Sequence, residues 1–221
     1  MHWVRTLSAK GPDRLAASHL RYQAQPAAAG WLHCVLLDCS ASMFRDGKLS
    51  LAKRLLLELC EQNYRSRRQL AVIAFAGDKA ELLQPPARAA AFNEAWISAL
   101  GGGGGSPLSA ALELAEQVLA RAHRRQPGLQ CQLWLISDFR LRQLPPRPTA
   151  PTAISHCTLI DCEQGRLPLG RGRELAAQWQ AEHLPVAQLW TKPTPRTTSL
   201  PGVTAFAPAM QSAVKSLQWR P

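Results

Sequence analysis

Four apolar runs of eight residues, separated by amphipathic segments, most constrain what this chain can fold into. Apolar residues predominate within them, which is typical of strands buried on both faces of a parallel sheet. Three of the four end in an aspartate. The runs are WLHCVLLD (31–38), QLAVIAFA (69–76), CQLWLISD (131–138) and ISHCTLID (154–161).

Helical periodicity appears between these runs. In residues 47–64 and 108–125, apolar side chains recur every three or four positions and form one face. Shorter helices are predicted over 91–100 and 172–183. Apolar strands that alternate with amphipathic helices predict an α/β fold, with a Rossmann-like, doubly wound, mostly parallel central sheet flanked by helices.

Weaker patterns predict the remaining strands. Residues 18–25 alternate and suggest an N-terminal strand extension, and residues 79–84 form a short strand that ends at Pro85-Pro86. Residues 186–190 suggest a last short strand.

The domain organisation follows from these elements. We expect residues 1–190 to form a single domain, and 191–221 to be a linker with a candidate C-terminal helix over 205–219.

Composition predicts the compartment. No run approaches the roughly 18 apolar residues of a membrane span, and the first residues lack the apolar core of a signal peptide. The six cysteines form no CxxC pair and no zinc spacing. They indicate buried thiols in a reducing compartment, with a Cys157–Cys162 disulfide as the alternative. We therefore expect a soluble, cytoplasmic protein without a membrane span.

The net charge is +11, from 26 Lys and Arg against 15 Asp and Glu. Arginines cluster in RSRR (65–68), AHRRQ (122–126) and GRGRE (170–174). A basic surface suits an acidic protein or a nucleic acid. No basic stretch carries interleaved aromatic residues or a nucleic-acid module. We therefore expect no nucleic-acid partner, and keep a basic nucleic-acid-binding protein as the less favoured alternative.

Oxygen-bearing side chains gather where strands end. DCSASM places Asp38, Ser40 and Ser42 directly after the first apolar run, and Asp138 ends the third. Ser106 lies in the glycine loop GGGGGSPLS (101–109), just before a predicted helix. Ligands bind outside the carboxyl ends of parallel strands, where these residues should converge.

A hard divalent cation is the ligand that these residues suit best. Mg²⁺ prefers oxygen ligands, and two carboxylates with three hydroxyls leave it incompletely liganded, ready to take an outside carboxylate. The alternative is that these residues only cap helices and form turns, as Ser and Asp often do.

Catalytic and phosphate-binding interpretations are weaker. DCSASM lacks the flanking glycines of a GxSxG nucleophile elbow, and none of the six histidines is placed to activate Ser40 or Ser42. The glycine loop has no lysine before its serine and follows a helix, so it is a poor P-loop. We expect neither a catalytic residue nor an organic cofactor.

The motifs DCSASM, GGSPLSAAL and LISDFR resemble, in order and spacing, the metal-ion-dependent adhesion site (MIDAS) of von Willebrand factor type A (vWA) domains. The resemblance implies a vWA fold and Mg²⁺ or Mn²⁺ as cofactor. Ser106 stands where threonine is usual, and Phe139 where many relatives have glycine. The metal ligands carried over by position are Asp38, Ser40, Ser42, Ser106 and Asp138.

Longer stretches resemble the C-terminal domain of the magnesium chelatase D subunit. They cover residues 6–190 and include LLQPPAR and LIDCEQGRLPLGRGRELAAQW; Arg67-Arg68 stands where the family has Arg-Asp. The family implies two partners: an AAA+ ATPase chelatase subunit, and a large tetrapyrrole-binding chelatase subunit that inserts the metal.

By resemblance, this chain would be a stand-alone, non-catalytic adaptor in a magnesium or cobalt chelatase, a ligase-type complex of chlorophyll-type or cobalamin biosynthesis. Its own metal would lie at an interface and would not be the metal inserted. The alternative is an intracellular vWA partner of a MoxR-type AAA+ ATPase in another complex.

Overall fold

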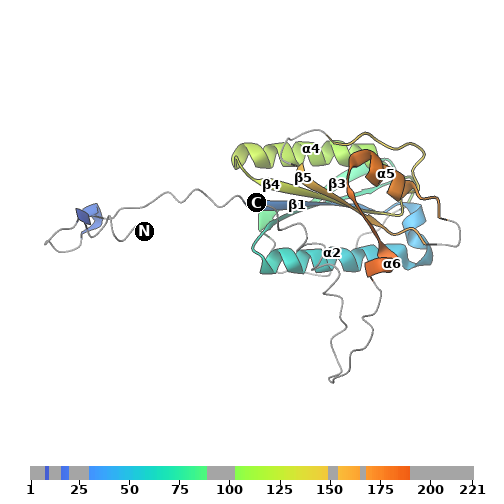
Figure 1. Cartoon of the computed structure of the whole chain (residues 1–221), viewed down its shortest axis with the longest axis horizontal. Coiled ribbons are helices and arrows are strands. Elements are labelled where there is room, and N and C mark those ends of the chain that lie inside the picture. Colours follow the sequence, from blue (N-terminus) through green and yellow to red (C-terminus); the bar gives the residue numbers. More distant parts are fainter. Residues whose placement is uncertain are drawn as a thin grey trace, which may run out of the picture. The chain divides into compact units, whose positions relative to one another are not determined.

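The computed structural model is drawn in Figure 1. It comprises two units, Met1–Gly30 and Trp31–Pro221. In the first, a 3₁₀ helix spans Ala17–His19, so the start of the predicted strand 18–25 is helical instead. The structure describes residues 8–9, 16–19, 30–88, 103–148, 154–164 and 168–189. Outside these residues lie the predicted helix 91–100, the rest of 18–25 and the tail 191–221.

A six-stranded sheet forms the centre of the second unit, in the order β3-β2-β1-β4-β5-β6. Every neighbouring pair is parallel except β2 and β3, which are antiparallel. This confirms the predicted α/β fold. The strands are β1 (Trp31–Asp38), β2 (Gln69–Ala76), β3 (Lys79–Arg88), β4 (Gln130–Ser137), β5 (Ile154–Asp161) and β6 (Glu182–Pro185).

Helices cover both faces of the sheet, with α4 and α5 on one side and α2 and α6 on the other (Figure 1). Helix α4 has the bounds that its periodicity predicts. In the described part of the chain, no helix combines the length and apolar character needed to cross a membrane. The helices are η2 (Ala41–Gly47, 3₁₀), α2 (Lys48–Arg65), α4 (Leu108–Arg125), α5 (Arg171–Trp179) and α6 (Val186–Leu189).

Two predicted strands need correction. Residues 186–189 form helix α6, and the final strand is the preceding segment Glu182–Pro185, which pairs with β5. The predicted helix 172–183 accordingly ends earlier, at Trp179.

Strand β3 does not stop at Pro85-Pro86 but continues to Arg88. It is the antiparallel edge strand of the sheet, and its register with β2 shifts around these prolines, between Val72↔Gln84 and Leu70↔Ala87. Proline lacks an amide hydrogen, so it is tolerated at edges and bulges of this kind.

The strand order reverses at the β1–β4 pair, since β1 connects outward to β2 while β4 leads outward to β5. In doubly wound sheets, the crevice at such a switch point is where ligands bind. Asp38 ends β1 and Asp138 directly follows β4. The fold therefore brings both predicted carboxylates to this crevice.

Candidate metal centre

Asp38 is the buried base of the centre. It ends β1 and is 0% exposed. One carboxylate oxygen, Oδ1, accepts the backbone N–H of Ser40 at 2.8 Å, which turns the chain sharply after the strand. The Ser40 and Ser42 hydroxyl oxygens lie 3.2 Å apart. The alternating DxSxS spacing thus turns these oxygens toward one another, as the sequence predicts.

Ser106 reaches the centre from the loop before α4. Its hydroxyl donates to Asp38 Oδ2 at 3.1 Å. Backbone bonds hold this loop in place: Gly103 N–H donates to Cys39 O at 3.0 Å, and Ala41 N–H donates to Gly104 O at 3.1 Å. The centre is therefore assembled across two loops that lie far apart in the sequence.

The loop needs glycine for a steric reason. Gly104 has φ +73°, and a Cβ on it would lie 2.8 Å from Gly77 Cα in the β2–β3 turn. Gly77 N–H also donates to Gly105 O at 2.9 Å. Backbone thus packs directly on backbone, which only residues without a side chain permit.

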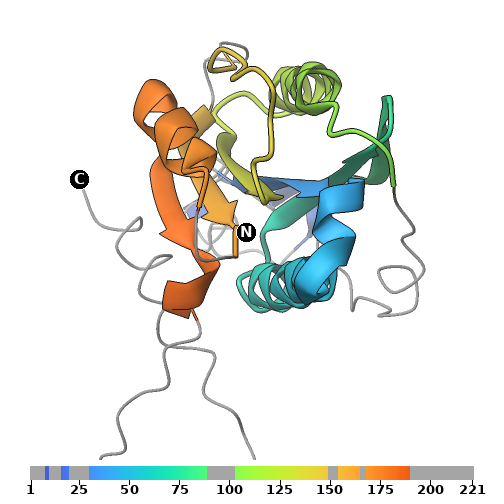
Figure 2. The ribbon, with the colours of Figure 1, turned by 90° about the vertical axis from the view of Figure 1, so that its right-hand side faces the viewer.

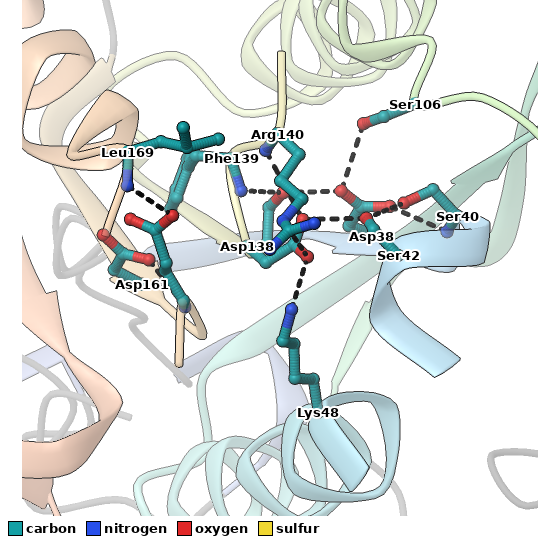
Figure 3. Close-up of polar contacts among 12 residues, drawn as sticks. Asp38, Ser40, Ser42, Lys48, Ser106, Asp138, Phe139, Arg140, Asp161 and Leu169 are labelled. Atoms are coloured by element: carbon teal, nitrogen blue, oxygen red, sulfur yellow. Dashed lines mark hydrogen bonds and ion pairs between the residues drawn. The ribbon is translucent and has the colours of Figure 1, made fainter. Parts of the chain in front are cut away.

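Asp138 closes the centre from β4 (Figure 3). Its Oδ1 accepts the Ser42 hydroxyl at 2.9 Å, and its Oδ2 accepts the Lys48 ammonium at 2.9 Å. Lys48 is the first residue of α2 and is 1% exposed. Arg140 adds a longer contact, Nε to Asp138 Oδ2, at 3.7 Å. The five predicted site residues are thus linked by hydrogen bonds into one cluster.

Burial raises the pKa of the Asp38 carboxyl, and hydrogen bonds from Ser137, Ser40 and Ser106 partly offset this effect. Ser137 ends β4 and donates to Asp38 Oδ2. Its hydroxyl oxygen also accepts the N–H of Phe139 at 2.9 Å, so one serine fixes both the carboxylate and the start of the next loop.

Sequence reasoning missed three residues of this cluster: Lys48, Ser137 and Arg140. Ser137 and Arg140 stand within two positions of Asp138, so their closeness in sequence to a predicted metal ligand could have identified them. Lys48 contacts Asp138 across 90 positions of sequence, and nothing local marked it.

The donor set fits a hard divalent cation. Two carboxylates and three hydroxyls converge, and the described residues contain no cluster of three His, Cys, Asp or Glu side chains that could hold a softer ion. A bound ion would be held by Asp38, Ser40, Ser42, Ser106 and Asp138. It would supply a positive charge that attracts an oxygen ligand from outside.

Phe139 takes an unusual backbone conformation, with φ +50°, at the position where the resemblance expects glycine. Its side chain is 1% exposed and belongs to the core under α4 and α5. A Cβ on Gly172 would lie 2.7 Å from Phe139 Cδ2, so α5 makes room for the ring by having glycine there. Asp138 remains within hydrogen-bond distance of Ser42 despite this substitution.

No histidine serves the site serines as a base among the residues whose structure is described. His33 lies within β1 and accepts the Trp134 indole N–H on Nδ1 at 3.0 Å. Burial and the nearby Arg68 lower its pKa to about 3. His183 contacts Asp161 instead. The geometry therefore gives no support to serine-based catalysis.

All six cysteines are buried and free, as expected, and Cys157 and Cys162 form no disulfide. Burial raises the pKa of Cys39 and Cys131 to about 11, and of Cys34, Cys60 and Cys157 to about 12. These thiols are therefore protonated at neutral pH, as buried cysteines usually are.

The fold and this cluster define the class of protein. Residues 34–140 match the family model of the von Willebrand factor type A (vWA) domain, and the six-stranded α/β sheet agrees with that match. A solved structure with the same fold is that of the conserved hypothetical protein BatB from Bacteroides thetaiotaomicron. Its TM-score is 0.55 at 14% identity, over 86% of this chain and all of that one.

Among curated proteins, the chain is 37% identical over 93 residues to the magnesium-chelatase 60 kDa subunit of Cereibacter sphaeroides. That match covers 42% of this chain but only 16% of the subunit. An uncharacterized protein of Methanocaldococcus jannaschii, MJ0910, is 26% identical over 153 residues, or 64% of this chain and 88% of that protein. The predicted resemblance to magnesium-chelatase subunits is confirmed.

Proposed function

We propose that this chain is a non-catalytic adaptor subunit of an ATP-dependent tetrapyrrole metal chelatase, for magnesium or cobalt. It docks its partners through a Mg²⁺ or Mn²⁺ ion at the candidate metal centre. The observation that carries this proposal is the convergence of five oxygen-bearing side chains at the β1–β4 switch point. The similarity to magnesium-chelatase subunits supports the choice of complex.

Charge explains why such an ion would attract a partner. Asp38 and Asp138 contribute two negative charges, while Lys48 and Arg140 both contact Asp138 and contribute two positive charges. The metal-free cluster is therefore close to neutral, and a divalent ion would leave it strongly positive. A carboxylate from another subunit is the natural ligand for that ion.

Docking, rather than chemistry, is the role that the residues favour. The cluster offers hydroxyls and carboxylates but no base beside a nucleophile in the described ranges. The AAA+ ATPase subunit would supply ATP hydrolysis and the large tetrapyrrole-binding subunit would insert the metal. The adaptor would bring the two together.

The test is capture of the two chelatase subunits from the same organism by the full-length chain, in Mg²⁺ and in EDTA. We expect capture in Mg²⁺, and loss of capture in EDTA or with Asp38→Ala. Glu61→Ala is the matched control, because Glu61 is an exposed carboxylate on α2 whose ion-pair partner within the described residues is Arg65 of the same helix. Circular dichroism checks that each variant is folded.

Capture that persists at full strength with Asp38→Ala would refute the metal bridge. Capture of an AAA+ ATPase from another complex, with neither chelatase subunit captured, would place the chain in a different complex with the same docking site.

A further inference from the structure

We propose that a groove beside the candidate metal centre binds an extended, acidic segment of a partner protein. One carboxylate of that segment would reach the metal while a neighbouring acidic side chain lies against Arg140 and Arg142. This inference rests on the proposed function, because it specifies the chemistry of the partner that the metal would hold.

The groove, here called the α4 groove, has a volume of about 690 Å³. One wall is residues 105–110, the start of α4 and the loop before it. The other is the segment that leaves β4, and Figure 2 shows this segment rising beside α4. The residues that line this second wall are Arg140, Leu141, Arg142, Gln143 and Pro145.

The α4 groove adjoins the candidate metal centre through two of its lining residues. Ser106 lines the groove and donates to Asp38. Arg140 also lines it and contacts Asp138. A chain that placed a carboxylate on the metal would therefore pass directly into the groove.

Contacts within the protein hold the walls of the α4 groove in place without a partner. The Pro145 carbonyl accepts the indole N–H of Trp179 at 3.0 Å and the Gln178 side-chain amide at 3.3 Å, both from α5. Leu141 packs against the core under α4. A preformed groove loses little conformational entropy when a segment binds, which favours affinity.

The charge of the groove selects an anion. Arg140 and Arg142 are both exposed on one wall, and Arg142 has no ion-pair partner in the part of the chain that the structure describes. The opposite wall adds no opposing charge, since the first turn of α4 contains no acidic residue. The metal ion would add two further positive charges at the near end.

The far end of the groove limits how long the acidic stretch can be. A second hollow of about 410 Å³ shares Ser109 and Pro145 with the first, and it is lined by Glu113 on α4 and by Arg147. Glu113 disfavours further acidic residues there. The segment that fits is acidic near the metal and becomes neutral or basic along α4.

The test measures binding of the purified large chelatase subunit to the immobilised full-length chain. Each variant is measured at a Mg²⁺ concentration that saturates it, at low and high salt. We expect Arg142→Glu to weaken binding about tenfold at low salt and less at high salt, mainly through slower association. Arg124→Glu is the matched control, because Arg124 is also exposed and lies at the far end of α4.

Equal effects of Arg142→Glu and Arg124→Glu would overturn the groove proposal, because net charge alone would then explain both. Asp38→Ala separates this failure from that of the proposed function. If Asp38→Ala abolishes binding while the two arginine variants behave alike, the metal bridge stands and only the groove is wrong. If Asp38→Ala binds like wild type, the proposed function itself fails.

Competition identifies the class of ligand. We expect oligoglutamate to displace the large subunit from wild type but not from Arg142→Glu, and an oligothymidylate of equal charge to displace it poorly. Equal displacement by the oligothymidylate, lost again in Arg142→Glu, would assign the groove to nucleic acid instead and overturn the proposal for a protein segment.

Discussion

Two strand ends at the same rim of the sheet carry an aspartate, and the two serve different purposes. At the candidate metal centre, Asp38 accepts hydrogen bonds from two hydroxyls and a backbone amide. These bonds hold the hydroxyl oxygens close to the carboxylate oxygens. One strand beyond β4, Asp161 ends β5. Its Oδ1 accepts the Glu163 N–H at 2.8 Å, and its Oδ2 lies 2.9 Å from His183 Nε2.

This second site, here called the Asp161 corner, is made of Asp161, Glu163, Gly172 and His183. Glu163 accepts backbone N–H groups of Leu169 at 2.8 Å and Gly170 at 3.0 Å, so the corner secures the loop that leads into α5. An aspartate at a strand end can therefore have quite different neighbours. Hydroxyls surround Asp38 at the candidate metal centre, whereas a backbone amide and a histidine contact Asp161.

The largest expected difference comes from Asp38→Asn. Loss of a charged ligand should weaken Mg²⁺ binding by about 100-fold or more, or about 2.7 kcal/mol. The metal-free fold should be at least as stable as wild type, because burial raises the pKa of Asp38 and its ionised form therefore costs free energy in the folded state. Calorimetric titration and urea unfolding measure the two effects.

Asp161→Asn should give the opposite pattern, with unchanged Mg²⁺ affinity and a less stable fold. A metal-binding defect in Asp161→Asn would show that the two sites are not separate.

Lys48→Met should lower the stability of the metal-free protein and raise the Mg²⁺ affinity of the candidate metal centre. Removing the ammonium leaves Asp138 buried with Ser42 and the longer Arg140 contact at 3.7 Å, so the metal-free protein should lose about 2 kcal/mol of stability. Without the competing positive charge, Mg²⁺ should bind about tenfold more tightly. Weaker Mg²⁺ binding would instead mean that Lys48 serves mainly to position Asp138.

Gly172→Ala tests how tightly the Asp161 corner is packed, because it adds a single methyl group and no charge. A Cβ there would lie 2.4 Å from Asp161 Oδ2 and 2.7 Å from Phe139 Cδ2. We expect a loss of about 1.5 kcal/mol in urea unfolding from overpacking, even though alanine is the better helix former. Stabilisation would show that the ring and the carboxylate move aside at little cost.

Ser106→Ala should have a smaller effect, weakening Mg²⁺ binding about tenfold because one of several oxygen donors is lost. Ser106→Thr keeps the hydroxyl, so its Mg²⁺ affinity should stay within about twofold of wild type. Titration of both variants decides whether the hydroxyl, rather than the loop geometry, carries the contact. Equal losses in the two variants would point to the loop.

Most of the fold and of the candidate metal centre could be predicted from the sequence. The contacts that could not be predicted join residues that lie far apart in the chain. Continuous apolar runs identified the four central strands, because strands buried on both faces leave a strong pattern. The edge strand β6 has no such pattern, since Glu182–Pro185 is only half buried. The more apolar residues 186–189 that follow were therefore mistaken for the strand.

The convergence of the five oxygen-bearing residues was predictable because parallel strands present their carboxyl ends on one rim. The role of Lys48 was not, since its contact with Asp138 joins two distant parts of the chain. The different role of Asp161 was likewise hidden, because His183 reaches it from the neighbouring strand. Metal binding by the centre stays a prediction.

The bulged strand β3 has a consequence for how this molecule can meet others. Proteins often associate by pairing an exposed strand with one from another chain. Here Pro85 and Pro86 lack the amide hydrogens that an added strand would use, and β6 at the opposite edge is only four residues long. Both borders of the sheet are therefore poor templates for an added strand.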